Sequence, residues 1–275
     1  DATIQVEPRR LFQIPDIFEA AKAKLPPNIG QLVDLEQPLV AKQTVLAPAE
    51  LAALYKSEKI PSHRFAFPQI HALAMSPAGF SADLLAAKLP GIELSDKLID
   101  ILFPKTDGNI EFEELSCIGL DPNSPDTLVG VVKIKRSSGY SGGPCTAGSG
   151  EFVSWWADTD GNGSYETFLG TSSVQVYDVP GIPADGVHCA VRLPVDLTPY
   201  RKKCHEGPVV LPIRAILSWA VPVPGNAPNT VPTWGNREQT LIHVTPSGVV
   251  HGPAGKIAIL GGIPVSMISD VTGMT

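Results

Sequence analysis

The sequence has no cluster of basic residues, no apolar run long enough to span a membrane and only four cysteines. Its 21 Lys and Arg are outnumbered by 28 Asp and Glu, and the net charge is -7. Without a basic patch, a nucleic-acid partner is not expected. The apolar stretch KIAILGGIPVSMI, which begins at Lys256, is broken by glycines and a proline. No transmembrane segment is therefore expected.

Charged residues are also scarce, at 18% of the chain, whereas glycine and proline occur 25 and 27 times. This composition is typical of many turns and extended segments and not of long helices with charged surfaces. Hydrophobic residues make up 43% of the 275 residues, which is enough to fill a sizeable core. The composition therefore indicates a globular protein with mainly β structure.

The few cysteines form neither a CxxC motif nor a Cys/His pattern typical of metal sites. All four lie between Cys117 and Cys204, and an even, clustered set indicates two disulfides in an oxidising compartment. We expect Cys145 to pair with Cys204 and Cys117 with Cys189. The other two pairings, or four reduced thiols in a cytosolic protein, are the alternatives. The disulfides favour a secreted or cell-surface location, extracellular or periplasmic.

The distribution of helix-like and strand-like residue patterns along the chain predicts three parts. Residues 1–105 form an N-terminal helical segment, residues 106–245 a β-sandwich domain, and residues 246–275 a C-terminal arm or a linker to a further domain. The predicted fold class is α+β, mainly β, with short helices packed on an antiparallel, jelly-roll-like sandwich.

The predicted helices are short because prolines interrupt the pattern. Apolar residues recur at helical spacing in IPDIFEAAKAKLPP (14–27), APAELAALYKSEK (47–59) and SADLLAAKLPGIELSDKLIDILF (81–103). Ser81 is a suitable N-cap for the third segment.

The predicted strands follow residue 106, where Val, Ile, Thr and aromatic residues become frequent and Gly, Pro, Asn and Asp separate them. Regularly spaced short strands of this kind are typical of a sandwich or jelly roll. The strand segments are TLVGVVKIKR, EFVSWWAD, YETFLGTSSVQVYDV, GVHCAVRLPVDL, VVLPIRAILSWAV and QTLIHV.

Several long segments resemble a family of uncharacterised, secreted bacterial β-sandwich proteins. They are HRFAFPQIHAL, TDGNIEFEELSCIGLDPN, IKRSSGYSGGPC, YETFLGT, LPVDLTPYRKKCHEGPVV and IRAILSWAVPVPGNAPNTVPTWGNR. The resemblance covers nearly the whole chain and implies no known activity. RAILSWAVPVPG is also similar to a strand and loop of jelly-roll domains appended to secreted subtilases, which implies a stability or binding module.

The segment GYSGGP (139–144) differs at one position from the GDSGGP around the nucleophile of trypsin-like proteases. Such a nucleophile needs a histidine and an aspartate, and in those enzymes both precede it. Only His63 and His71 precede Ser141, and Tyr140 stands where the motif has Asp. We therefore expect a glycine-rich turn between two strands. A hydrolase built on Ser141 or on a histidine-containing cleft is the alternative.

The segment DTDGNGSYE (158–166) reproduces the first half of a calcium-binding loop, in which alternate oxygen ligands surround the ion and glycine permits a sharp turn. The expected calcium ligands are Asp158, Asp160, Asn162, Ser164 and Glu166. The pattern departs at Leu169, where a bidentate Glu would stand. The alternative is an ordinary hairpin turn at Asn162–Gly163. A bound calcium would be structural.

Other polar and aromatic groups offer weaker candidates. The acidic set in TDGNIEFEE (106–114) predicts a turn into a strand with a solvated face, with a second cation site as the alternative. Trp219 and Trp234 flank the loop VPVPGNAPNTVP and could form a platform for a ligand such as a sugar, although burial beneath that loop is the commoner arrangement. Trp155 and Trp156 should point to opposite faces of their strand.

These observations predict a non-enzymatic structural, assembly or adhesion module, secreted or at the cell surface, with a protein partner or self-association. The alternative is a carbohydrate- or protein-binding accessory domain of a larger secreted enzyme. The hydrolase is a third hypothesis, with no assembled catalytic constellation behind it.

Overall fold

The computed structural model describes residues 44–76, 80–89, 91–92 and 95–247, together with the backbone of 259–260 and 263–264. The helices and the main sheets lie in one compact unit, Gln43–His251. The short strands β8 (Ile259–Leu260) and β9 (Ile263–Pro264) pair with each other in antiparallel fashion and belong to the other unit. The helix expected over residues 14–27 lies outside the described residues.

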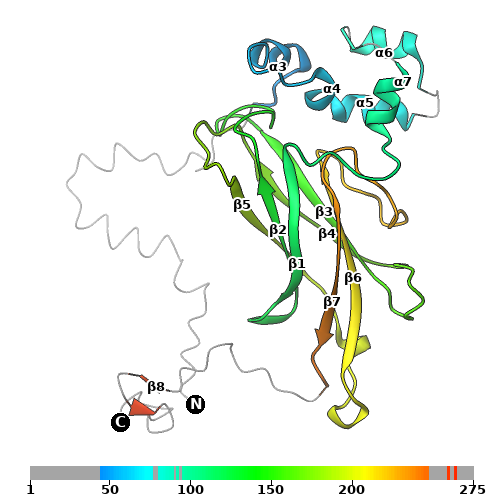
Figure 1. Ribbon diagram of the computed structural model, residues 1–275, viewed down its shortest axis with the longest axis vertical. Coiled ribbons are helices and arrows are strands. Elements are labelled where there is room, and N and C mark those ends of the chain that lie inside the picture. The colour runs from blue at the N-terminus through cyan, green and yellow to red at the C-terminus, as the bar shows by residue number, and fades with distance from the viewer. Residues whose placement is uncertain are drawn as a thin grey trace, which may run out of the picture. The chain divides into compact units, whose positions relative to one another are not determined.

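Seven strands form a β-sandwich of two antiparallel sheets, with the orders β1-β2-β5 and β4-β3-β6-β7 (Figure 1). Each of the six predicted strand segments overlaps one of these strands, which confirms the mainly β fold. The strands are β1 (Glu113–Asp121), β2 (Ser124–Ile134), β3 (Ser149–Ala157), β4 (Thr167–Val176), β5 (Val187–Pro194), β6 (Val209–Trp219) and β7 (Arg237–Val244).

The connections between the two sheets give the sandwich its topology. The chain crosses from one sheet to the other after β2, after β4 and after β5, as in Greek-key sandwiches. Two short 3-10 helices, Thr198–Tyr200 and Cys204–Glu206, lie in the last of these crossings. A jelly roll has eight strands in two Greek keys. The two sheets here contain seven strands, and the expected jelly roll is therefore not confirmed.

Within the described residues, five short helices lie at one end of the sandwich (Figure 1). They are α3 (Pro48–Leu54), α4 (Ser62–Phe65), α5 (Phe67–Ala74), α6 (Ala82–Lys88) and α7 (Asp96–Leu102). Ser81 and Ser95 cap α6 and α7 by accepting backbone N–H groups, as predicted for Ser81. Among the described residues, no helix has the length and apolar character needed to cross a bilayer.

The two adjacent tryptophans of β3 face opposite sides of their sheet, as predicted. Trp155 is fully buried between the two sheets and packs over Gly130 of β2, where a Cβ would meet its ring at 3.3 Å. Trp156 is also fully buried, in a separate cluster on the outer face. Its indole N–H donates to the carbonyl of Gly225 at 2.8 Å. The proline-rich loop therefore covers Trp156.

The predicted disulfide between Cys117 and Cys189 is wrong, and both residues are free thiols. Cys117 on β1 pairs with Val131 of β2, and Cys189 on β5 pairs with Val132 of the same strand. Because β2 lies between them, their Cα atoms are separated by two strand spacings, roughly 10 Å. A disulfide requires less than about 7 Å.

The predicted disulfide between Cys145 and Cys204 is also wrong, and both thiols are free and exposed. Cys145 precedes β3 and Cys204 precedes β6, and these two strands are antiparallel neighbours. The two cysteines therefore lie at opposite ends of the sheet, roughly 30 Å apart for strands of this length. The disulfide argument for an oxidising compartment no longer holds.

Candidate functional site

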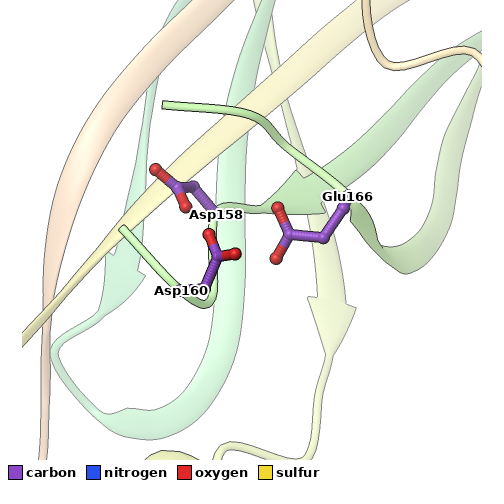
Figure 2. A group of neighbouring side chains, drawn as sticks. All are labelled: Asp158, Asp160 and Glu166. Atoms are coloured by element: carbon purple, nitrogen blue, oxygen red, sulfur yellow. The ribbon is translucent and has the colours of Figure 1, made fainter. Parts of the chain in front are cut away.

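The hairpin loop between β3 and β4 brings three carboxylates together. Asp158, Asp160 and Glu166 each offer an oxygen, and these oxygens lie within 4.8 Å of one another. Figure 2 shows the three side chains close together in the loop. Carboxylate oxygens are the ligands that hard cations such as calcium prefer. The donor set therefore fits the predicted metal.

Asp158 is held in place by the backbone of its own loop. Its side chain is buried, with 4% exposed. One oxygen accepts the N–H of Gly161 at 2.8 Å and the other accepts that of Gly163 at 2.9 Å. Both glycines have positive φ, 75° and 84°, which a side chain would disfavour. The loop is thus turned around Asp158 in the manner that its calcium-loop pattern predicts.

The other two carboxylates are exposed and also fixed by local hydrogen bonds. Asp160 accepts the side-chain N–H of Asn162 at 2.8 Å. Glu166 accepts the backbone N–H of Thr159 at 2.9 Å as well as its hydroxyl proton. These hydrogen bonds from Thr159 hold the pKa of Glu166 below its usual value, so it is ionised at neutral pH.

The two remaining predicted ligands, Asn162 and Ser164, are hydrogen-bonded to each other. The side-chain oxygen of Asn162 accepts the N–H of Ser164 at 2.7 Å. The structure thus brings together the three acidic members of the predicted set, and it joins Asn162 and Ser164 to each other.

A second cluster of charged groups lies between the helices and the sandwich. The guanidinium of Arg64 on α4 forms a two-pronged ion pair with Glu113 on β1, at 3.0 and 2.6 Å. Its Nε donates to the carbonyl of Gly139 at 3.1 Å. Both charged side chains are fully buried. The acidic segment 106–114 was expected to present a solvated face, and for Glu113 this expectation is wrong.

Aromatic rings surround the arginine on several sides. The Arg64 Cζ atom lies 3.9 Å from the ring centre of Phe112, 4.3 Å from that of Trp219 and 4.8 Å from that of Trp234. A guanidinium is attracted to aromatic faces, particularly when both are removed from water. We call Arg64, Glu113 and these rings the arginine box.

The two tryptophans of the arginine box, which were candidates for a ligand platform, are both buried. Trp219 and Trp234 are buried, with 1% and 2% exposed. An exposed aromatic platform on these two residues is therefore wrong, because their faces are occupied by Arg64, Phe112 and Phe67. They are buried against Arg64, and the proline-rich loop covers Trp156.

A third buried charge-bearing residue lies beside the box. Glu151 on β3 is fully buried, and neither of its oxygens has a hydrogen-bond partner among the described residues. Glu151 lies on the inward-facing side of its strand, because side chains alternate along a strand and Val153 and Trp155 also face the core. The spacing of two residues from buried apolar neighbours is the signal in the sequence that could have identified Glu151. The same spacing relates Glu113 to the buried Leu115 on β1.

The loop GYSGGP is held in place by hydrogen bonds to Asp178 and Tyr55. Asp178 accepts the N–H of Tyr140 at 2.8 Å and the N–H of Gly142 at 3.1 Å. It also accepts the hydroxyl proton of Tyr55, at 2.7 Å. Ser141 itself has a positive φ of 63°, and within the described residues no histidine contacts its hydroxyl through a hydrogen bond. The glycine-rich turn is confirmed as its structural role.

Removing the Tyr55 hydroxyl tests how this loop is fastened. That oxygen both donates to Asp178 and accepts the N–H of Gly142 at 3.0 Å. Tyr55→Phe is expected to lower the free energy of unfolding by about 1–3 kcal/mol because it removes two hydrogen bonds, each worth about 0.5–1.5 kcal/mol. Urea denaturation measures the loss. Tyr200→Phe, a partly exposed tyrosine in another loop, is the control, and equal effects of the two changes would refute this role for Tyr55.

The histidine-containing cleft of the hydrolase hypothesis corresponds to a groove of about 270 Å³ beside α4 and α7. His63 and Lys97 line it, with Ser62 and Ser95, and none of the described residues of its wall carries a carboxylate. Burial, together with the charges of Arg64 and Lys97, lowers the pKa of His63, so it is neutral at neutral pH.

A scan against protein-family models finds no match, and no curated protein is significantly similar in sequence.

Proposed function

We propose that this chain is a calcium-binding β-sandwich module of a secreted or cell-surface protein, with a structural, assembly or adhesion role and no catalytic activity. The observation that carries the proposal is the convergence of Asp158, Asp160 and Glu166 within 4.8 Å. These side chains are presented by a hairpin whose two strands belong to the four-stranded sheet. A cation bound there would join the two ends of the hairpin loop.

The expected affinity of this loop agrees with an extracellular setting. Two of its three carboxylates are exposed, and the bidentate twelfth ligand of high-affinity loops is replaced by Leu169. Loops of this kind bind calcium in the range of roughly 10⁻⁴ to 10⁻³ M, as extracellular modules do. Calcium in the cytosol is too dilute to fill such a site, so the proposed site and the proposed location support each other.

Calcium should raise the melting temperature of the protein. With about 10 mM calcium and a dissociation constant near 1 mM, the stabilisation is roughly 1.4 kcal/mol, which corresponds to about 3–6 °C for a domain of this size. Differential scanning calorimetry with calcium and with EDTA measures the shift.

Two variants make the melting experiment specific to the loop. Asp160→Asn removes one charge while keeping an oxygen for the N–H of Asn162, and it should abolish most of the shift. Asp107→Asn changes an exposed aspartate outside the loop and should leave the shift intact. An unchanged melting temperature of the natural protein with and without EDTA would refute the calcium proposal.

The assembly role is tested separately from calcium. An assembly module should form defined oligomers or fibres on size-exclusion chromatography and in negative-stain electron microscopy. A strictly monomeric chain at all concentrations and calcium levels would contradict self-association and leave a separate protein partner as the remaining form of the proposal.

A further inference from the structure

The buried carboxylates at the junction of the helices and the sandwich carry an inference that is independent of the calcium loop. Glu113 and Glu151 are both fully buried beside a single arginine. If both carboxylates were ionised, the cluster would hold two negative charges and one positive charge away from water. A buried charge without a partner is strongly unfavourable, so one of the two acids should carry a proton.

The hydrogen bonds identify which acid that is. Both oxygens of Glu113 accept N–H groups of Arg64, an arrangement that requires the ionised form. Neither oxygen of Glu151 accepts or donates a hydrogen bond within the described structure. Glu151 is therefore the neutral acid.

We propose that Glu151 and the arginine box form a pH-sensitive joint between the helical segment and the sandwich. The helices are seated on the sandwich while Glu151 is protonated. When Glu151 loses its proton, the buried negative charge favours a state in which α4 separates from the sandwich end and water reaches the carboxylate. Arg64 is the residue of α4 inserted at this point, so the contact of α4 with the sandwich responds first.

The groups that face Glu151 support this direction of the response. Burial, and next to it the negative charge of Glu113 on β1, raise the pKa of Glu151, while Arg64 on α4 lowers it only in part. Tyr140, from the loop after β2, and Cys189 on β5 also face it, and the charge of Glu151 contributes to raising the pKa of each. No positive group other than Arg64 is among the causes that act on Glu151.

The pH dependence of stability follows from the raised pKa of Glu151. An unfolded glutamate has a pKa near 4.5, so above that pH the folded protein holds a proton that the unfolded chain has lost. The stabilisation is complete below the unfolded pKa and is lost as the pH rises towards the folded pKa. The folding equilibrium constant should fall by up to about tenfold per pH unit in that interval.

Urea denaturation between pH 5 and 9 tests the stability effect. The folding equilibrium constant of Glu151→Gln should decline less with pH than that of the natural protein. The ratio of the two constants should therefore grow by up to about tenfold per pH unit. Glu151→Met provides the same test with an apolar side chain, in case the unpaired amide prevents folding. Glu113→Gln should instead destabilise at every pH, because it breaks the pair with Arg64.

Hydrogen exchange followed by mass spectrometry locates the opening. Peptides containing α4 should lose protection at alkaline pH in the natural protein but not in Glu151→Gln at the same pH, a comparison that cancels the intrinsic pH dependence of exchange. Peptides of β6 and β7 distant from the box should behave alike in both proteins. A natural protein whose stability and α4 protection vary with pH as they do in both Glu151 variants would overturn the proposal.

Discussion

Arg64→Ala is expected to lower the free energy of unfolding by about 3–5 kcal/mol, because it leaves the ionised Glu113 buried without a partner. The loss has two further sources. The Nε contact with the Gly139 carbonyl disappears, and the faces of Phe112 and Trp219 lose the cation that packs on them. Urea denaturation followed by tryptophan fluorescence measures the change, since two tryptophans line the box.

The control for this prediction is an arginine in an exposed ion pair. Arg136 pairs with Glu111, and both side chains are about half exposed. Arg136→Ala should change the stability by less than about 1 kcal/mol. Adding Glu113→Leu to Arg64→Ala should recover part of the loss, since the unpaired carboxylate is then gone. A loss below 1 kcal/mol for Arg64→Ala would contradict the account of the arginine box.

Trp155→Ala is the second change with a large expected effect, a loss of about 3–5 kcal/mol. The indole fills the space between the sheets above Gly130 and donates to the hydroxyl of Ser172 at 3.0 Å. Its removal leaves a cavity where the sheets meet, and the sheets cannot close it without moving their strands. The same urea denaturation measures this loss.

Leu241→Ala provides the matched comparison, because Leu241 lies on β7 with 67% of its surface exposed. This change should alter the stability by no more than about 0.5 kcal/mol. If Trp155→Ala cost as little as Leu241→Ala, the placement of Trp155 in the core would be wrong.

The sandwich could be predicted from the sequence because strand patterning is a local property. Alternation and β-branched residues mark each strand, and the opposite orientations of Trp155 and Trp156 follow from a period of two. The serine cap at residue 81 is also a local signal, since its side chain bonds an N–H three residues later.

The pairing of distant residues could not be predicted in the same way. The cysteine spacing gives no information on which strands become neighbours, and β2 separates Cys117 from Cys189. Nor does the sequence around Arg64 show that 49 residues later Glu113 will meet it. Such contacts depend on how the helical segment is seated on the sandwich.

The proposed calcium site combines a local signal with a feature that depends on the fold. Its ligands are only a few residues apart, so the sequence predicted which carboxylates would gather. The structure adds that Asp158 is buried and held by the backbone of the loop. The sequence could not show this, because the burial depends on the strands that flank the loop.

Isothermal titration with calcium most directly tests the central claim, that this loop is a cation site on a β-sandwich module. The account predicts one binding event per chain with a dissociation constant of roughly 10⁻⁴ to 10⁻³ M. It should be lost in Asp160→Asn and kept in Asp107→Asn. No calcium-dependent heat in the natural protein, or equal binding by Asp160→Asn, would contradict it.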